Sequence, residues 1–163
     1  MSRGFVKEGD QEETPMVPPR AFLPAGVVNY VTPTGMELLM QERQDLLDER
    51  DAIATGGQES DARVQRNFIN AKLELLENRI KIAKVMQPTG KKDEIAFGSI
   101  VSIRMNGEEM TLQITGVDEA NAAKGKIPFT SPMAKGLFGH HIGDIFDIKI
   151  PTGLKTIKVL DIK

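Results

Sequence analysis

The spacing of apolar residues changes near position 90, and this change constrains the fold more than any other feature of the chain. Between 36 and 85 the apolar residues recur every three or four positions, as on one side of an α-helix. From about 99 onward they alternate with polar residues, as in strands that bury one face. The stretch "MQPTGKKDE", with Pro88 and Gly90, separates the two patterns and is typical of a linker or sharp corner. The chain is therefore predicted to be α+β, with helices first and a sheet second.

The first part contains two helix-spaced segments on either side of a polar stretch that holds two glycines. Thr32 can cap the first helix and Pro33 suits its first turn, whereas Gly56 and Gly57 favour its end. Two apolar rows spaced by seven run along this helix: Leu39, Leu46, Ile53 and Met40, Leu47, Ala54. Apolar stripes joined by a short turn must bury each other, so an antiparallel coiled-coil hairpin is predicted over residues 32–86.

The second helix is predicted to begin at a cap provided by Ser60 or Asp61. Alternating steps of four and three define the seam that we expect to face the first helix: Val64, Phe68, Ala71, Leu75, Asn78, Ile82 and Val85. A second row widens the apolar face: Ile69, Leu73, Leu76, Ile80 and Ala83. Asn78 would fix the register of the seam at some cost in stability.

The second part, residues 94–163 after a linker at 87–93, is predicted to be a small sheet with one helix. Its strands are expected in "SIVSIRM", "MTLQITGV", "IFDIKI" and "KTIKVLDI". Asn106-Gly107 predicts a hairpin turn between the first two strands, and "PTG" at 151–153 predicts another between the last two. The segment "SPMAKGLFG" predicts a short helix with Ser131 as cap and Gly139 at its end.

Residues 1–31 precede both parts and are predicted to form an extended arm. Prolines at 15, 18, 19 and 24 and the acidic cluster from Glu8 to Glu13 forbid a long helix there. Scattered apolar residues would let the arm dock on a partner or on the body of the protein: Phe5, Val6, Phe22, Leu23, Val27, Val28 and Tyr30. A loosely packed tail is the simpler alternative.

Composition and charge exclude several classes of function. The chain has no cysteine, which excludes disulfides, thiolate catalysis and cysteine-ligated zinc. A net charge of −2 gives no reason to expect nucleic acid as the direct ligand, because phosphate binding needs clustered Lys and Arg. No apolar run approaches the roughly 20 residues that cross a bilayer, and the start is unlike a signal peptide. We therefore expect a cytoplasmic protein.

Five strings in the second part occur together in a recognisable order: "FGSIVSI", "ITGVDEAN", "SPMAKGLFG", "IGD" and "IPTG". In this order and with comparable spacings they resemble the bacterial GreA/GreB family of transcription elongation and transcript-cleavage factors. "TPTGMELL" is similar to the start of the family's first helix, and the arm resembles that of the longer GreB-like members. The resemblance covers nearly the whole chain, most firmly residues 95–163.

The resemblance implies an N-terminal coiled coil, an FKBP-like C-terminal domain and RNA polymerase as partner. In such factors the globular domain holds the rim of the polymerase secondary channel while the coiled coil enters it. Acidic residues at the tip then help to hold a Mg²⁺ ion beside the polymerase's own aspartates, so that backtracked RNA is cut. We expect a monomer that is not an enzyme by itself, has no cofactor of its own, binds no specific DNA sequence and approaches nascent RNA only indirectly.

The predicted tip departs from the family pattern, which places an Asp and, three residues later, a Glu after a glycine. Alignment on Gly57 puts Gln58 at the Asp position and Asp61 at the Glu position. Gln58 is neutral and a poorer magnesium ligand than a carboxylate, although Glu59 could substitute for it. Asp61 and Glu59 are therefore the candidate catalytic and metal-binding residues, with Mg²⁺ shared only in the polymerase complex.

Length is a second departure, since both helical segments are about one heptad shorter than in typical members. At about 1.5 Å per residue, the tip would stop roughly 10 Å short of the usual reach. Two alternatives remain open: the tip acids assist cleavage, or the protein occupies the channel and regulates polymerase without cleavage. Asp61 could also be only a helix cap, and Asp48, Glu49 and Asp51 more simply form a charged helix flank with Arg50.

Candidate partner-binding residues lie in two of the matched strings: Ser131, Pro132, Met133, Lys135, Asp118 and Glu119. A turn-stabilising role for Asp118 and Glu119 is the simpler alternative, and a solvated side chain is the default for Lys135. His140 and His141 follow a glycine and are expected to be turn residues and not metal ligands.

Two rival functions come from other classes of protein. An FKBP-like prolyl isomerase or chaperone needs an aromatic-lined pocket, and this part of the chain has only Phe97, Phe129, Phe138 and Phe146 as aromatic residues. A coiled-coil adaptor without a polymerase role is the other rival.

Overall fold

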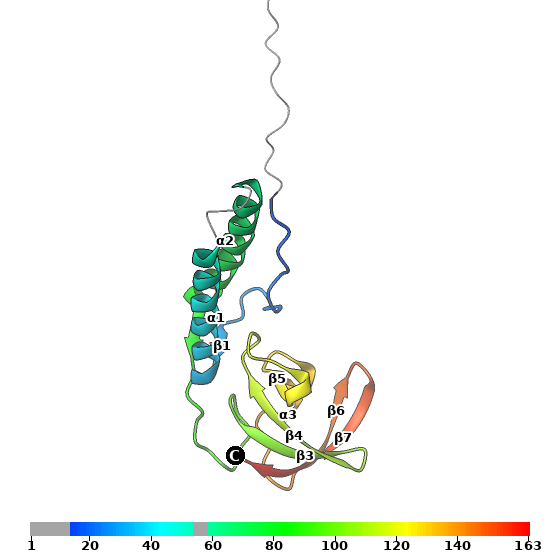
Figure 1. Ribbon diagram of the computed structural model, residues 1–163. Coiled ribbons are helices and arrows are strands. Elements are labelled where there is room, and N and C mark those ends of the chain that lie inside the picture. Colours follow the sequence, from blue (N-terminus) through cyan, green and yellow to red (C-terminus); the bar gives the residue numbers. More distant parts are fainter. Residues whose placement is uncertain (1–13, 54–58) are drawn as a thin grey trace, which may run out of the picture.

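The protein consists of a two-helix finger beside a sheet-rich domain (Figure 1). The computed structural model describes residues 14–53 and 59–163. The predicted helix-ending glycines Gly56 and Gly57, together with Ala54, Gln58 and the Phe5-Val6 pair, lie outside the described residues. None of the described helices is long and apolar enough to cross a membrane. The prediction of an α+β fold is confirmed.

Two long helices and two short strands form the finger. Strand β1 (Asn29–Val31) leads into helix α1 (Pro33–Ala52), and helix α2 (Glu59–Ile82) runs directly into strand β2 (Ala83–Val85). The side chain of Thr32 accepts a hydrogen bond from the backbone N–H of Gly35 at 2.9 Å, so the predicted cap of α1 is confirmed. Strands β1 and β2 pair in parallel and close the base of the finger, a feature that the sequence pattern did not predict.

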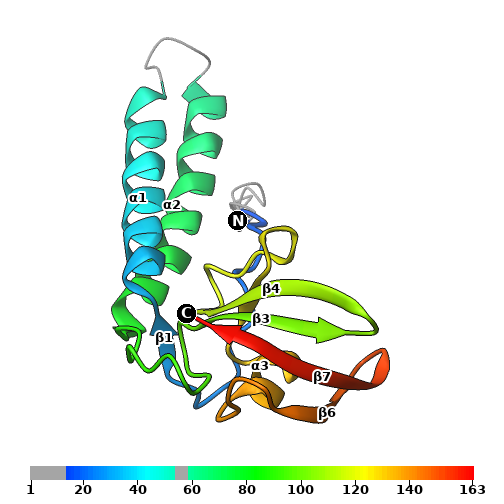
Figure 2. The ribbon, with the colours of Figure 1, turned by 90° about the horizontal axis from the view of Figure 1, so that it is seen from below.

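Helix α2 faces α1 with a different row of side chains from the predicted seam. The buried hydrophobic cluster of the finger consists of Val31, Leu39, Leu46, Ile69, Leu73 and Leu76. In the predicted seam, Val64 is 65% exposed, Leu75 is 39% exposed and Asn78 is also exposed. The prediction was wrong because α2 carries two adjacent apolar rows, and helical spacing alone does not tell which one meets α1. Leu39 and Leu46 of α1 were assigned correctly, and Figure 2 shows the two helices side by side.

The start of α2 also differs from its prediction. Glu59, the first residue described after 54–58, is already helical, so Ser60 and Asp61 lie within α2 and neither caps it. A helix start is difficult to place to within one or two residues when several polar residues follow one another. The consequence is that Glu59 and Asp61 both occupy the first turn, where the helix dipole favours carboxylates.

The C-terminal domain is a five-stranded sheet in the order β5-β4-β3-β7-β6. Its elements are β3 (Ile100–Met105), β4 (Glu108–Thr115), the 3-10 helix η1 (Ala122–Lys124), β5 (Lys126–Pro128), α3 (Pro132–Leu137), β6 (Ile145–Ile150) and β7 (Gly153–Ile162). The four predicted strands and the short helix are confirmed, whereas three-residue β5 was missed. Asn106 and Gly107 both have positive φ, as the hairpin turn between β3 and β4 requires.

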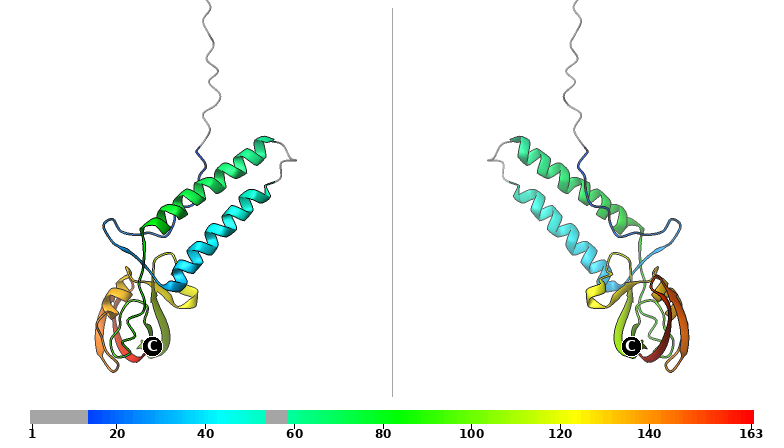
Figure 3. Two further views of the ribbon diagram at one scale, coloured as in Figure 1. Left: turned by 90° about the vertical axis from the view of Figure 1, so that its left-hand side faces the viewer. Right: turned by 90° about the vertical axis from the view of Figure 1, so that its right-hand side faces the viewer.

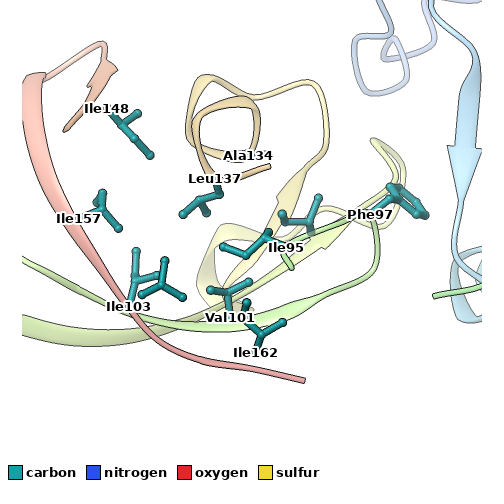
Figure 4. Close-up of a cluster of buried hydrophobic side chains, with 11 residues drawn as sticks. Ile95, Phe97, Val101, Ile103, Ala134, Leu137, Ile148, Ile157 and Ile162 are labelled. Carbon is teal, nitrogen blue, oxygen red and sulfur yellow. The ribbon is translucent and has the colours of Figure 1, made fainter. Parts of the chain in front are cut away.

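Helix α3 covers one face of this sheet and completes its core (Figure 4). Ala134 and Leu137 of α3 are fully buried against the sheet, as are Ile103 and Ile157. The helix lies very close to β6, because a Cβ at Gly136 would come within 2.8 Å of the Ile148 side chain. Ser131 caps α3 by accepting a hydrogen bond from the backbone N–H of Ala134, as predicted.

The finger projects away from the sheet, as the two side views in Figure 3 show. The C-terminal end of α1 and the N-terminal end of α2 lie at its free end, and β1 and β2 lie at its base. With 20 residues, α1 is about 30 Å long. The domain therefore carries an elongated projection whose free end holds the predicted tip acids.

The assignment of the buried row predicts unequal costs for two neighbouring leucines. Leu76 is fully buried, so Leu76→Ala should lower the free energy of unfolding by about 2–5 kcal/mol. Leu75→Ala removes the same atoms from a partly exposed site and should cost less than half as much. Urea denaturation followed by far-UV circular dichroism measures both values. Equal losses would contradict the assigned packing of α2.

Candidate functional site

The free end of the finger is rich in exposed acidic side chains. Asp48, Glu49 and Asp51 lie in the last turns of α1, and Glu59 and Asp61 lie in the first turn of α2. The carboxylate of Asp51 lies 3.5 Å from Nε of Arg50, so one of these charges is partly balanced within α1. The end of the finger therefore presents carboxylates to the solvent from both helices.

Glu59 and Asp61 have suitable chemistry for magnesium but an incomplete arrangement. Carboxylate oxygens are preferred ligands of Mg²⁺, which takes six of them or waters in an octahedron. Residues two apart on a helix do not face each other, so Glu59 and Asp61 leave α2 on different sides. Within residues 14–53 and 59–163, no group of three or more potential metal ligands is present. Glu59 and Asp61 therefore form no complete metal site with the other described residues.

The base of the finger is fixed to the C-terminal domain by a buried ionic cluster around Asp118. The Asp118 side chain is 4% exposed and lies between two guanidinium groups, 3.1 Å from Arg20 and 3.3 Å from Arg79. Arg20 comes from the arm, Arg79 from α2 and Asp118 from the domain. Arg20 also makes two hydrogen bonds to Glu42 of α1, and these bonds are the main reason that its pKa is raised. One carboxylate thus connects all three parts of the chain.

Glu119 forms a second connection at the start of α1. Its side chain is 2% exposed, accepts a hydrogen bond from the Thr32 hydroxyl at 2.5 Å and lies 3.3 Å from the ammonium of Lys126. A Cβ at Gly35 would lie 2.7 Å from a Glu119 carboxylate oxygen, so only glycine fits there without displacement. The carboxylate also lies at the positive end of the α1 dipole.

Aromatic packing adds a third connection between the finger base and the sheet. Tyr30 of β1 contacts Phe97 and Phe129, with ring centroids 6.1 Å and 5.8 Å apart. A Cβ at Gly116 would lie 2.6 Å from the carbonyl oxygen of Tyr30, so the backbones approach closely there. Because Phe97 and Phe129 are engaged in this packing, they give little support to an isomerase pocket.

The predicted partner-binding residues separate into exposed and buried groups. Pro132 and Lys135 are exposed on α3, whereas Met133 is half-buried against the core and the Ser131 side chain caps the helix. The side chains of Asp118 and Glu119 make the contacts within the chain that are described above, and they expose almost no surface to a partner. The exposed residues of α3 remain the accessible candidates.

His140 and His141 belong to a turn that Asp144 organises. The His140 ring stacks on Phe146 at a centroid distance of 3.4 Å, and its Nδ1 lies 3.3 Å from Asp144. Asp144 also accepts the backbone N–H of His141 at 2.8 Å, and this hydrogen bond is the main reason that its pKa is lowered. The His140 ring therefore has a packing partner in the turn before β6, whereas His141 is exposed and is held there by its backbone hydrogen bond to Asp144.

Sequence reasoning missed the role of Arg20 and Arg79. One signal was available for Arg20, because "PPRAFLP" places a single cation among prolines and apolar residues. A cation in such a segment needs a partner when the segment packs against the protein. No local pattern identifies Asp118 as that partner, since it lies 98 residues away.

Comparisons with known proteins assign the chain to a family. The model for the GreA/GreB transcription elongation factor C-terminal domain matches residues 90–163. A protein named transcription elongation factor GreA from Trichlorobacter lovleyi is 33% identical over 135 residues, which cover 77% of this chain and 85% of that protein. The GreA of Ruegeria pomeroyi is 33% identical over 149 residues, covering 82% and 96%. The chain belongs to the GreA/GreB family of transcription elongation factors.

Solved structures of the same group were also found. The GreA factor homolog 1 (Gfh1) protein of Thermus thermophilus is 25% identical, with 82% of this chain and 97% of that chain covered and a TM-score of 0.40.

The cluster at the finger base predicts a large cost for removing one charge. Asp118→Asn keeps the side-chain shape but removes the buried charge that faces both arginines and leaves Arg20 with Glu42 alone, so it should lower the free energy of unfolding by about 3–5 kcal/mol. Glu109→Gln is a suitable control, because Glu109 pairs with Arg104 on the exposed face of β3 and β4 and should cost about 0–1 kcal/mol. Chemical denaturation of both variants makes the comparison. A loss at Asp118 no larger than at Glu109 would show that the cluster does not stabilise the joint.

Proposed function

We propose that the protein binds RNA polymerase at its secondary channel and acts on backtracked or arrested elongation complexes. Membership of the GreA/GreB family supports the partner and the process. The projecting finger carries the proposal further, because its free end holds carboxylates and its base is fixed to the domain by three sets of contacts. A rigid projection of this kind can present side chains inside a cavity of a larger enzyme while the domain remains outside.

The proposed chemistry is assistance to the transcript cleavage that polymerase itself carries out. Asp61, exposed in the first turn of α2, would supply a carboxylate oxygen to a shared metal site. Glu59 would supply a second carboxylate nearby. The Mg²⁺ ion, when bound, would make water more nucleophilic and stabilise charge on the phosphate oxygens. The chain would then act as a donor of ligands and not as an enzyme by itself.

Occupation of the channel without cleavage is the alternative, and two observations favour it. Glu59 and Asp61 leave α2 on different sides, which disfavours joint binding of one ion. The helical segments are also expected to be about one heptad shorter than in typical family members; α1 is about 30 Å long, and magnesium coordination tolerates only small displacements. In this alternative the finger would regulate polymerase by filling the channel.

Binding to polymerase is expected to depend on the exposed cation of α3. Lys135→Glu should weaken the affinity for core RNA polymerase several-fold, with a change in its salt dependence, because rim charges steer association. Lys149→Glu on the solvent face of β6 makes the same charge change elsewhere and should have a smaller effect. Titration of labelled polymerase at two salt concentrations measures both. If the unaltered protein fails to bind elongation complexes at modest salt, the proposed partner is wrong.

Transcript cleavage separates the two proposed activities. On stalled, backtracked complexes, Asp61→Ala should lower the stimulated cleavage rate about tenfold or more, the usual scale for weakening a metal site. Glu74→Ala removes an exposed acid farther along α2 and should leave the rate unchanged. Unchanged cleavage in the double variant Asp61→Ala and Glu59→Ala would exclude the ligand-donor role. Tight binding without any stimulation by the unaltered protein would establish the channel-filling alternative.

A further inference from the structure

A groove between α1 and α2 runs along one side of the finger, and the arm lines one wall of its lower part. The lower section has a volume of about 310 Å³ and lies between arm residues 17–21 and the helices. Its helical lining includes Glu42 and Leu46 of α1 and Lys72 and Leu75 of α2. The described arm therefore lies on the finger, which favours docking over a loosely packed tail.

The same two helix faces continue toward the free end as an open apolar section of about 500 Å³. On α1 it is lined by Glu49 and Ile53, which follow Leu46 at steps of three and four. On α2 it is lined by Phe68 and Val64, which precede Lys72 at steps of four. Residues at such steps share one side of a helix, so the two sections are consecutive parts of one groove.

The described arm points along this groove toward the open section. The carbonyl of Ala21 accepts a hydrogen bond from Arg79, whereas Val17 and Pro18 lie beside Lys72. Lower residue numbers of the arm thus lie closer to the free end, as the dark blue segment beside α2 in Figure 1 shows. From the level of Lys72 to that of Val64 the distance along α2 is about 12 Å.

The segment that precedes the described arm matches the open section in length and chemistry. Phe5 comes twelve residues before Val17, and twelve extended residues span up to about 40 Å, so the reach is ample. Phe5 and Val6 are the only adjacent apolar pair before Met16, and Lys7 follows them. A cation beside this pair complements Glu49 at the groove and Asp61, which lies on the Phe68 side of α2.

We propose that Phe5 and Val6 occupy the open section of the groove, as the continuation of the docked arm. The apolar pair covers the exposed side chain of Val64 and the half-buried ring of Phe68. Lys7 then lies near the carboxylates at the free end. The arm is an intramolecular ligand of the finger, and this inference does not depend on the proposed function.

Absence of tryptophan and cysteine from the natural chain makes a direct test possible. Phe5→Trp introduces a single indole, whose emission should be blue-shifted in the free protein. Adding Val64→Asp should return the emission to that of a solvated indole, because a charge then lies in the groove. Asn70→Asp, on the opposite side of α2, is the matched control and should leave the emission unchanged. Both substituted positions are exposed, so folding should be retained and is checked by circular dichroism.

Disulfide formation tests the position and the identity of the occupant. Phe5→Cys with Val64→Cys should form an intramolecular disulfide at least tenfold faster than Phe5→Cys with Asn70→Cys. Equal rates for the two pairs, or a solvated indole at position 5 in the free protein, would overturn the proposal. Disulfides that form only between chains would identify a second copy as the occupant. Protection of a lone Val64→Cys thiol only when polymerase is added would identify polymerase instead, and both results would overturn it.

Discussion

The arrangement of the molecule depends on one buried carboxylate, that of Asp118, which lies between Arg20 of the arm and Arg79 of α2. Buried charges are costly unless they are paired, so each guanidinium gains from the carboxylate and the carboxylate requires both. Because the three groups come from three separate parts of the chain, the cluster forms only when arm, finger and domain have met. It therefore couples the packing of the finger to the folding of the domain.

Two glycines and the first turn of α1 let the base of the finger approach the C-terminal domain closely, in addition to the ionic contacts. Gly35 leaves room for the Glu119 carboxylate above the first turn of α1, and Gly116 lets the sheet approach the backbone of Tyr30. With Tyr30 packed against the paired rings of Phe97 and Phe129, the base of the finger has contacts on several sides. Because the finger is anchored in this way, the position of its free end is fixed relative to the C-terminal domain. The acids of the first turn of α2 are therefore placed by residues at the opposite end of the helix.

The features that local chemistry decides could be predicted from the sequence. The caps at Thr32 and Ser131 and the turn at Asn106-Gly107 depend on neighbours within four residues, and all three are present. The face of α2 that meets α1 could not be predicted, because the choice between Leu75 and Leu76 depends on what the arm and α1 cover. The acids of the candidate site, Asp61 and Glu59, were chosen by aligning Gly57 with the glycine of the GreA/GreB tip pattern. Their divergence from each other follows because both lie within α2, where residues two apart do not face each other, and the succession of polar residues did not show that Glu59 is helical.

The arm lies beside the two helices as a third chain along part of the finger, and it increases the width of the finger there. Each helix with its side chains is about 10 Å across, and the docked segment adds to this pair from the base to the level of Lys72. A passage that admits two helices alone would have to strip the arm away, breaking the contacts of Arg20, before the finger could enter beyond that level. A wider passage would admit all three chains together, so the width of such a passage would decide whether the arm is released.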